Sequence, residues 1–240
     1  FEGACVMEQM EPILRQGLTA LGLSAEQIPQ LQRYAQLLVE TNKVMNLTAI
    51  TEPADIATLH FLDCAALLTL ADFRNKTVAD VGTGAGFPGL PLKILEPSLS
   101  ITLLDAQGKR VNFLQQVCDD LGLTGVECVH ARAEEFAAGH REGCDIVTSR
   151  AVAALPMLCE LCLPLVKVGG VFVAMKSVDS DAELRSASRA ISLLGGANPE
   201  VKDYVIPGTQ VTHRAVLIKK IRKTPEKYPR MFAKIKKNPL

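Results

Sequence analysis

The chain has 240 residues, 48% of them hydrophobic, which is enough to bury a sizeable core and argues against a disordered chain. Lys plus Arg and Asp plus Glu number 26 each, so the formal net charge is zero. The seven cysteines are scattered, and neither a secretory leader nor an apolar run of about 18 residues is visible, so we expect a cytoplasmic protein without a membrane partner.

Residues 8–70 show helical spacing and little else, so residues 1–72 are predicted to form an N-terminal helical accessory segment. Two apolar stripes carry this prediction. The first consists of Ile28, Leu31, Tyr34, Leu37, Leu38, Val44 and Met45, and the second of Ile56, Leu59, Leu62 and Leu67.

From residue 77 onward, short apolar runs alternate with helical stretches, which predicts βαβ units and a parallel sheet with helices on both faces. Two further runs at 203–207 and 213–220 are separated by Pro207-Gly208 and are predicted to form a hairpin. The expected α/β domain covers residues 73–220. The first five runs are "TVADVG" (77–82), "SITLLD" (100–105), "VECVHA" (126–131), "CDIVTS" (144–149) and "VFVAMK" (171–176).

The stretch "ADVGTGAGFPGL" (79–90) places a glycine-rich loop between the first strand and a helix beginning near Pro88. Gly84 to Gly89 satisfy the G-x-G-x-x-G pattern of dinucleotide sites, with Asp105 where a ribose-binding carboxylate is expected. An alternative G-x-G-x-G pattern, preceded by Asp80, suits S-adenosylmethionine, which also requires close approach to the backbone. The glycines alone leave both an NAD-dependent oxidoreductase and a methyltransferase open.

Two cations follow strands further along the chain, Arg150 in "DIVTSRA" (145–151) and Lys176 in "FVAMKS" (172–177). The carboxyl ends of parallel strands meet at the edge where open α/β sheets bind ligands. Arg150 and Lys176 are therefore predicted to carry a catalytic role beside the glycine loop.

Several ordered stretches resemble the bacterial family of guanine methyltransferases of small-subunit ribosomal RNA called GidB or RsmG. They are "NLTAI" (46–50), "HFLDCAALL" (60–68), "DVGTGAGFPGLPLKI" (80–94), "LLDAQGKRVNFL" (103–114), "ARAEEF" (131–136), "SRA" (149–151) and "TPEKYPR" (224–230). The resemblance implies a class I S-adenosylmethionine methyltransferase fold, Rossmann-like with a mostly parallel seven-stranded sheet. It implies methylation of ring nitrogen seven of a guanosine in 16S ribosomal RNA, free or in the ribosomal particle.

The resemblance also implies which residues hold the cofactor, S-adenosylmethionine. These are Gly82, Phe87, Ala133, Glu134 and Arg150. The glycine pattern and the end of the second strand add Asp80, Gly84, Gly86 and Asp105, whose carboxylate would accept from the ribose hydroxyls. The resemblance further implies that the segment around His60 and Asp63 packs beside the glycine loop, with a hydrogen bond between these two side chains on one helix face as the alternative.

Other chemistries fit the sequence less well. An enzyme that methylates the adenine amino group would be expected to carry an Asn/Asp-Pro-Pro-aromatic run where this chain has "SRAV". A cytosine-carbon enzyme needs a reactive thiolate, whereas Cys159 and Cys162 stand in an apolar helical stretch and are predicted to be core thiols. The histidines and cysteines show no ligand spacing, so no metal site is expected.

Residues 219–240 hold nine Lys or Arg against one Glu, and the rest of the chain therefore carries 17 basic and 25 acidic residues. We expect the basic tail, residues 221–240, and the strand end before it to clamp RNA without affecting cofactor affinity. A solvated, structural or protein-binding extension is the alternative. The chain is expected to act as a monomer, with RNA contacts at Lys219, Lys220, Arg222, Lys223, Lys227 and Arg230.

Overall fold

The computed structural model describes residues 2–150 and 153–240. Its centre is a seven-stranded sheet of order β3-β2-β1-β4-β5-β7-β6, parallel from β3 to β5, with β7 antiparallel to both of its neighbours. The predicted mostly parallel sheet and the predicted hairpin are both confirmed. The strands are β1 (Thr77–Val81), β2 (Ser100–Asp105), β3 (Val126–His130), β4 (Cys144–Arg150), β5 (Val166–Ser177), β6 (Glu200–Val205) and β7 (Thr212–Lys219).

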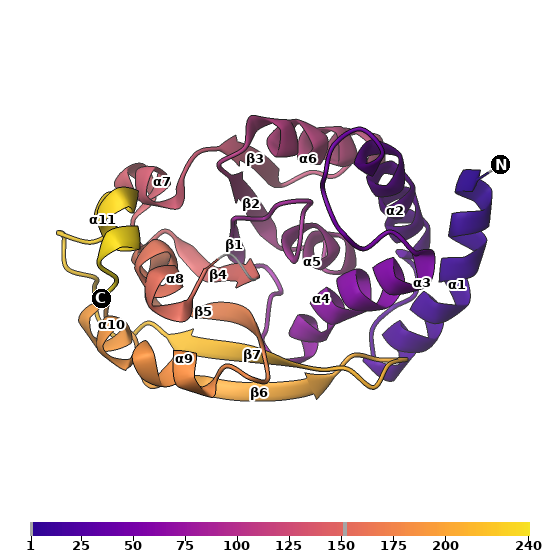
Figure 1. Cartoon of the computed structure of the whole chain (residues 1–240). Helices are drawn as coiled ribbons and strands as arrows, with labels where there is room; N and C mark the ends of the chain where they lie inside the picture. The colour runs from indigo at the N-terminus through magenta and orange to yellow at the C-terminus, as the bar shows by residue number, and fades with distance from the viewer. Residues whose placement is uncertain (1, 151–152) are drawn as a thin grey trace.

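Helices cover both faces of the sheet (Figure 1), and two separate clusters of buried apolar side chains lie beneath them. One cluster joins α1 (Glu2–Ala20) and α2 (Ile28–Asn42) to α5 (Gly89–Leu95) and α6 (Gly108–Leu121). The other lies under α7 (Ala133–His140), α8 (Leu155–Cys162), the 3-10 turn η3 (Leu163–Leu165), α9 (Asp181–Ser186), α10 (Ser188–Leu193) and α11 (Phe232–Lys237). The N-terminal helices therefore share a core with the sheet.

The first predicted apolar stripe extends too far, because the helix ends before its last two members, Val44 and Met45. Helix α2 stops at Asn42, whose side-chain oxygen accepts hydrogen bonds from the backbone N–H groups of Leu47 (2.8 Å) and Thr48 (3.0 Å). These bonds turn the chain out of the helix, because they satisfy donors that the next helical turn would otherwise use. Val44 consequently lies outside the stripe, with 85% of its surface exposed.

The segment between the N-terminal helices and the sheet contains an irregular helical run. It begins with α3 (Pro53–Asp55), continues as a π-helical stretch, η1 (Ile56–Leu62), and ends with α4 (Asp63–Ala66) and the 3-10 turn η2 (Leu67–Thr69). π-Helical turns are uncommon and are found often at functional sites. This one carries His60, which it buries against the glycine loop.

The sheet order places β1 beside β4, and the helices that follow these two strands lie on opposite faces. This arrangement creates a switch point, and ligands of open α/β sheets bind in the crevice outside the carboxyl ends of the strands there. The glycine loop follows β1, and Arg150 is the last residue of β4. Among the described residues, no helix combines the length and apolar character needed to cross a membrane.

Candidate active site

Asp80 fixes the conformation of the glycine loop. One carboxylate oxygen accepts from the Thr83 hydroxyl (2.6 Å) and the Gly89 N–H (2.9 Å), and the other accepts from the Thr148 hydroxyl (3.0 Å). Burial raises the pKa of Asp80 to about 6, against the opposing effect of these hydrogen bonds. The predicted cofactor contact at Asp80 is wrong, because the side chain is completely buried; it positions the loop instead.

Asp105 holds the outer part of the same loop. Its carboxylate accepts from the backbone N–H groups of Gly84 (2.9 Å) and Gln107 (2.9 Å). Gly84 has φ +59°, and a Cβ built on it would meet no protein atom within 4 Å. The protein leaves space beside this backbone, as close approach of a ligand requires.

Gly86 lacks a side chain where the protein itself needs the space. A Cβ at this position would collide with the Tyr34 hydroxyl and would lie 2.6 Å from a Leu90 methyl carbon. The Tyr34 hydroxyl donates a hydrogen bond to the carbonyl of Ala85. The missing side chain at Gly86 therefore makes room for the packing of α2 against the loop, and the predicted cofactor contact of its backbone stays a prediction.

The glycine loop does not present a dinucleotide site. In such sites the pyrophosphate binds to free N–H groups at the start of the helix that follows. Here α5 begins only at Gly89, and the Gly89 N–H is already bonded to the buried carboxylate of Asp80. This geometry argues against the NAD alternative.

A pocket of about 160 Å³ lies at the carboxyl ends of β1 and β2. It brings together four residues predicted to bind the cofactor, namely Gly82, Asp105, Ala133 and Glu134. The remaining lining residues are Val81, Leu104, Ala106, Ala131, Arg132, Leu161 and Phe232. Its lining combines small side chains near the strand ends, Gly82, Ala106, Ala131 and Ala133, with two acidic side chains, Asp105 and Glu134.

Arg150 reaches from the end of β4 towards the N-terminal segment. Its guanidinium donates a hydrogen bond to Nδ1 of His60 (3.0 Å) and lies 4.9 Å from the centre of the Phe87 ring. The His60 ring stacks on Phe87 with a centroid distance of 4.1 Å. The expectation that the "HFLDC" segment packs beside the glycine loop is therefore confirmed by its contacts.

His60 is a neutral acceptor in this arrangement. Because an arginine can only donate, Nδ1 must carry the lone pair and Nε2 the proton, and the pattern thus assigns Nε2–H as the donor to the Thr48 hydroxyl (2.8 Å). Burial, with the Arg150 charge as a second cause, lowers the pKa of His60 to about 3. The hydrogen bonds Thr48–His60 and His60–Arg150 connect the "NLTAI" stretch to the "SRA" stretch. No spacing in the sequence indicated this connection.

A second polar cluster involves the neighbouring Asp63. This buried carboxylate accepts from the Tyr204 hydroxyl (2.6 Å) and pairs with Nδ1 of His213 (3.1 Å), which raises the pKa of His213. His60 and Asp63 are thus not bonded to each other. Tyr204 and His213 belong to the terminal hairpin and were not among the predicted site residues; their only sequence signal is that they lie at the ends of its two strands.

Lys176 follows Met175, the partner of Arg150 in the sheet, but is engaged within the protein. Its ammonium donates to the carbonyl of Ala153 (2.6 Å) and pairs with Glu183 (2.7 Å), and only 10% of the side chain is exposed. These bonds connect Lys176 to Ala153 and to α9. They favour a positioning role over direct contact with a substrate, and the catalytic role of Lys176 stays a prediction.

The cysteines of the "CELC" stretch are core residues, as predicted. Cys159 and Cys162 lie on α8 with no exposed surface, and burial raises the pKa of both thiols. A thiolate is therefore disfavoured at both positions. Within residues 2–150 and 153–240, no three His, Cys, Asp or Glu side chains are grouped in a way that could hold a metal ion.

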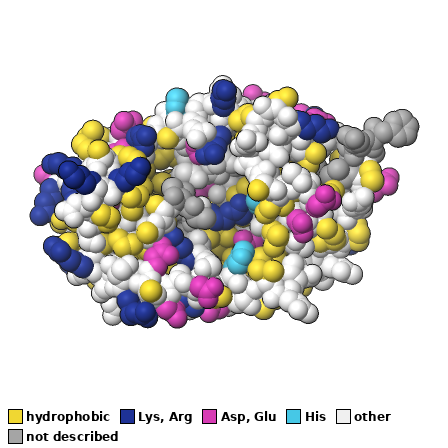
Figure 2. All heavy atoms as spheres, viewed as in Figure 1, with side chains coloured by type: hydrophobic (Ala, Val, Ile, Leu, Met, Phe, Trp, Pro, Cys, Tyr) yellow, Lys and Arg dark blue, Asp and Glu magenta, His cyan; other side chains and the backbone are white. Residues whose placement is uncertain are grey.

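The predicted RNA-binding residues fall into three groups. Lys220 is 1% exposed and donates to the carbonyls of Leu163 (2.6 Å) and Val166 (2.9 Å), so its predicted RNA contact is wrong. Arg230 pairs with the buried Glu160 (2.7 Å). The exposed cations are Lys219, Arg222, Lys223 and Lys227. Figure 2 shows Lys and Arg gathered at the end of the molecule where α11 lies in Figure 1.

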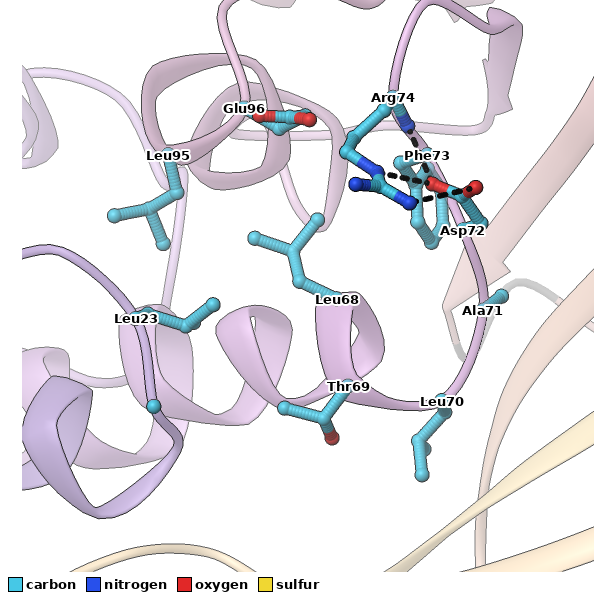
Figure 3. Close-up of a pocket in the computed structure, with 11 residues that line it drawn as sticks. Leu23, Leu68, Thr69, Leu70, Ala71, Asp72, Phe73, Arg74, Leu95 and Glu96 are labelled. Carbon is cyan, nitrogen blue, oxygen red and sulfur yellow. Dashed lines mark hydrogen bonds and ion pairs between the residues drawn. The ribbon is translucent and has the colours of Figure 1, made fainter.

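A larger pocket of about 660 Å³ lies away from the predicted site, among the helices of the N-terminal segment (Figure 3). Leu23, Leu68 and Leu95 point into it, and Asp72 and Arg74 pair with each other at its rim (3.1 Å). None of the predicted cofactor residues lines this pocket. Its paired charges, Asp72 and Arg74, point to no ligand.

Solved structures with a similar fold include methyltransferases. TYW2 of M. jannaschii in complex with AdoMet matches with a TM-score of 0.53 at 13% identity, over 66% of this chain and 75% of that one. TrmN from Thermus thermophilus matches with a TM-score of 0.52 at 23% identity, over 66% of this chain and 48% of that one. These likenesses support the class I fold.

Relatives found by sequence are more similar to this chain than these solved structures are. The ribosomal RNA small subunit methyltransferase G of Alkaliphilus metalliredigens is 44% identical over 233 residues, covering 95% of this chain and 98% of that protein. The protein of the same description from an Exiguobacterium species is 46% identical over 221 residues, covering 91% and 93%. The GidB family model, described as rRNA small subunit methyltransferase G, matches residues 27–212. The chain therefore belongs to the GidB family of small-subunit ribosomal RNA methyltransferases.

Proposed function

We propose that this protein transfers a methyl group from S-adenosylmethionine to ring nitrogen seven of a guanosine in 16S ribosomal RNA. The observation that carries the proposal is the pocket in which Gly82, Asp105, Ala133 and Glu134 converge at the carboxyl ends of β1 and β2. Family membership supports the substrate class. The choice of nitrogen seven rests on the family and on the chemistry below.

The residues around the pocket fit the cofactor. The open space beside Gly84 admits a ligand against the backbone, and Asp105 lies at the end of β2, where a carboxylate can accept from ribose hydroxyls. Ala133 and Glu134 begin α7 and would border the base. Phe87 does not line the pocket; its buried ring packs against His60 and Arg150, and its predicted cofactor contact stays a prediction.

The methyl transfer itself requires no proton transfer to or from the protein. Bound S-adenosylmethionine supplies an electrophilic methyl group, and the in-plane lone pair of guanine nitrogen seven forms the new N–C bond as the S–C bond breaks and its electrons return to sulfur. Nitrogen seven carries no proton in guanine, so no general base is needed. The protein contributes by orienting the two reactants and by tolerating the positive charge on the methylated base.

Arg150 is the residue best placed to orient the acceptor. An arginine fork can donate to the O6 edge of guanine or to a carboxylate, and His60 restricts its rotation by accepting one of its hydrogen bonds. We propose that Lys176 acts on the same site indirectly, by holding Ala153 and Glu183. The buried, raised-pKa thiols of Cys159 and Cys162 give no support to carbon methylation through a cysteine nucleophile.

Calorimetric titration of the protein with S-adenosylmethionine and, separately, with NAD tests the cofactor. We expect binding of S-adenosylmethionine and no measurable heat with NAD. Binding of NAD without a response to S-adenosylmethionine would overturn the proposal. The proposed monomer and its cytoplasmic location stay predictions; sedimentation of the protein with and without cofactor tests the first.

A further inference from the structure

The cofactor pocket has one wall from a distant part of the chain. Phe232, the first residue of α11, lines it together with Ala133 and Glu134 at the start of α7. The guanidinium of Arg132, which also lines the pocket, lies 4.5 Å from the centre of the Phe232 ring. Figure 1 shows α11 beside α7 at the same end of the molecule.

Contacts on both sides of Phe232 hold the tail against the folded core and keep Phe232 at the pocket. The guanidinium and backbone N–H of Arg230 donate to Glu160, whose side chain has no exposed surface. Arg141 donates to the backbone carbonyls of Thr224 (2.8 Å) and Tyr228. Ile235, one turn after Phe232, is buried in the apolar cluster under α8. The residues before and after Phe232 are therefore anchored to the folded core.

We propose that Phe232 completes the subsite for the adenine of S-adenosylmethionine, so that the C-terminal tail is part of the cofactor site. An aromatic side chain offers a flat apolar surface to a heterocyclic base. The lining also includes Leu161 and Ala133, whose apolar side chains suit the same kind of ligand. This inference rests on the proposed function, because it assumes that S-adenosylmethionine is the ligand of this pocket.

The proposal contradicts the expectation that the tail leaves cofactor affinity unchanged. A clamp that only contacts RNA would be removable without effect on the cofactor. A tail that supplies a wall of the adenine subsite is not removable in this way, because its loss opens the pocket to water.

The test is calorimetric titration of full-length variants with S-adenosylmethionine and with adenosine. Phe232→Ala is expected to weaken binding of both ligands by roughly 5- to 100-fold, the range for loss of one base–aromatic contact. Phe232→Tyr should retain binding. The matched control is Met231→Ala, which removes the neighbouring, 70% exposed side chain and should change neither affinity. If Phe232→Ala proves unstable, Phe232→Leu keeps an apolar side chain against Arg132. This variant should still lower the affinity for both ligands.

Equal affinities of wild type and a folded Phe232→Ala protein would overturn the inference while leaving the proposed function intact. A loss for S-adenosylmethionine without a loss for adenosine would also overturn it, because the ring would then act on another part of the ligand. Failure of the wild-type protein to bind S-adenosylmethionine would instead contradict the proposed function.

Discussion

At the scale of single residues, the site depends on side chains that never need to touch a substrate. Asp80 fixes the conformation of the glycine loop by accepting hydrogen bonds from it, and His60 accepts a hydrogen bond from the guanidinium of Arg150. Sequence motifs identified Arg150 and the loop, but they identified His60 only as part of a segment near it. The pairing could not be predicted, because the two residues are 90 positions apart and meet through the packing of a π-helical turn on the loop.

Because the space beside Gly84 is open, a substitution there tests directly where the cofactor lies. Gly84→Ala should lower affinity for S-adenosylmethionine at least 10-fold, because the new methyl group would occupy space that the ligand needs. Gly122→Ala is the matched control, since Gly122 has a similar φ of +63° and an equally open Cβ direction but ends α6. Both variants should lose about 1 kcal/mol of stability from the left-handed conformation.

Calorimetry measures the two affinities, and thermal unfolding measures the two stabilities. The placement of the cofactor beside Gly84 is contradicted if both variants bind S-adenosylmethionine as wild type does.

The buried neutral His60 predicts how acid affects stability. Its pKa is about 3 in the folded protein against 6.5 when exposed, so only the unfolded chain takes up this proton as the pH falls below about 6.5. The unfolding free energy should therefore decrease from about pH 6.5 downward, by up to about 1.4 kcal/mol per pH unit from this group alone. His60→Asn, which keeps an acceptor for Arg150, should lack this part of the decrease.

Urea unfolding of both proteins at pH 7, 6 and 5 gives the comparison. Asp80 and His213 also titrate, both with the opposite sign to His60 because their pKa values are raised in the folded protein, but both are present in wild type and variant. Parallel pH dependences would show that His60 is not buried in its neutral form.

At the scale of elements, the basic tail differs most from its prediction. Its composition indicated a nucleic-acid contact, and seven of the nine cations of residues 219–240 are exposed. The structural use of Lys220 and Arg230 could not be predicted, because it depends on a buried carboxylate and two carbonyls elsewhere in the chain. Hydrophobic spacing predicted the helical N-terminal segment better, since Ile28, Leu31 and Leu38 are all buried on one side of α2.

The Arg230–Glu160 pair is expected to fasten the tail. Arg230→Ala leaves a fully buried carboxylate without its partner and should destabilise the protein by about 3 kcal/mol. Because α11 follows directly, affinity for S-adenosylmethionine should fall as well. Thermal unfolding and calorimetry check the two effects, with Arg222→Ala, an exposed neighbour, as the control. Unchanged stability in Arg230→Ala would mean that the tail is held elsewhere.

The exposed lysines of α11 should contribute to RNA affinity through counterion release. Replacing Lys234, Lys236 and Lys237 by glutamine should reduce the slope of log affinity against log salt by about 2, at about 0.7 per phosphate contact on single-stranded RNA. Filter binding with a small-subunit ribosomal RNA fragment at several salt concentrations measures it. The control replaces Arg15 and Arg74, which are exposed near the N-terminal helices. Parallel lines for wild type and the triple variant would exclude the tail from RNA binding.

At the scale of the whole molecule, alternating strands and helices were enough to predict the parallel sheet and its terminal hairpin, because each apolar run was bounded by turn residues, and the family resemblance implied the seven strands that the structure shows. The sequence could not predict that the helices α1 and α2 share a core with α5 and α6, or that the last helix lines a pocket at the carboxyl ends of β1 and β2. Both depend on contacts between distant segments. The switch point between β1 and β4 then places the loop, Arg150 and the pocket on one edge.

Methylation of small-subunit ribosomal RNA by the purified protein, followed by borohydride reduction and aniline treatment, tests the central claim most directly. Aniline cleaves the treated chain at 7-methylguanosine, so we predict one new cleavage, at a guanosine of 16S ribosomal RNA, that requires both the enzyme and S-adenosylmethionine and is absent with Gly84→Val. Transfer of labelled methyl groups to the RNA without any such cleavage would contradict the proposed reaction.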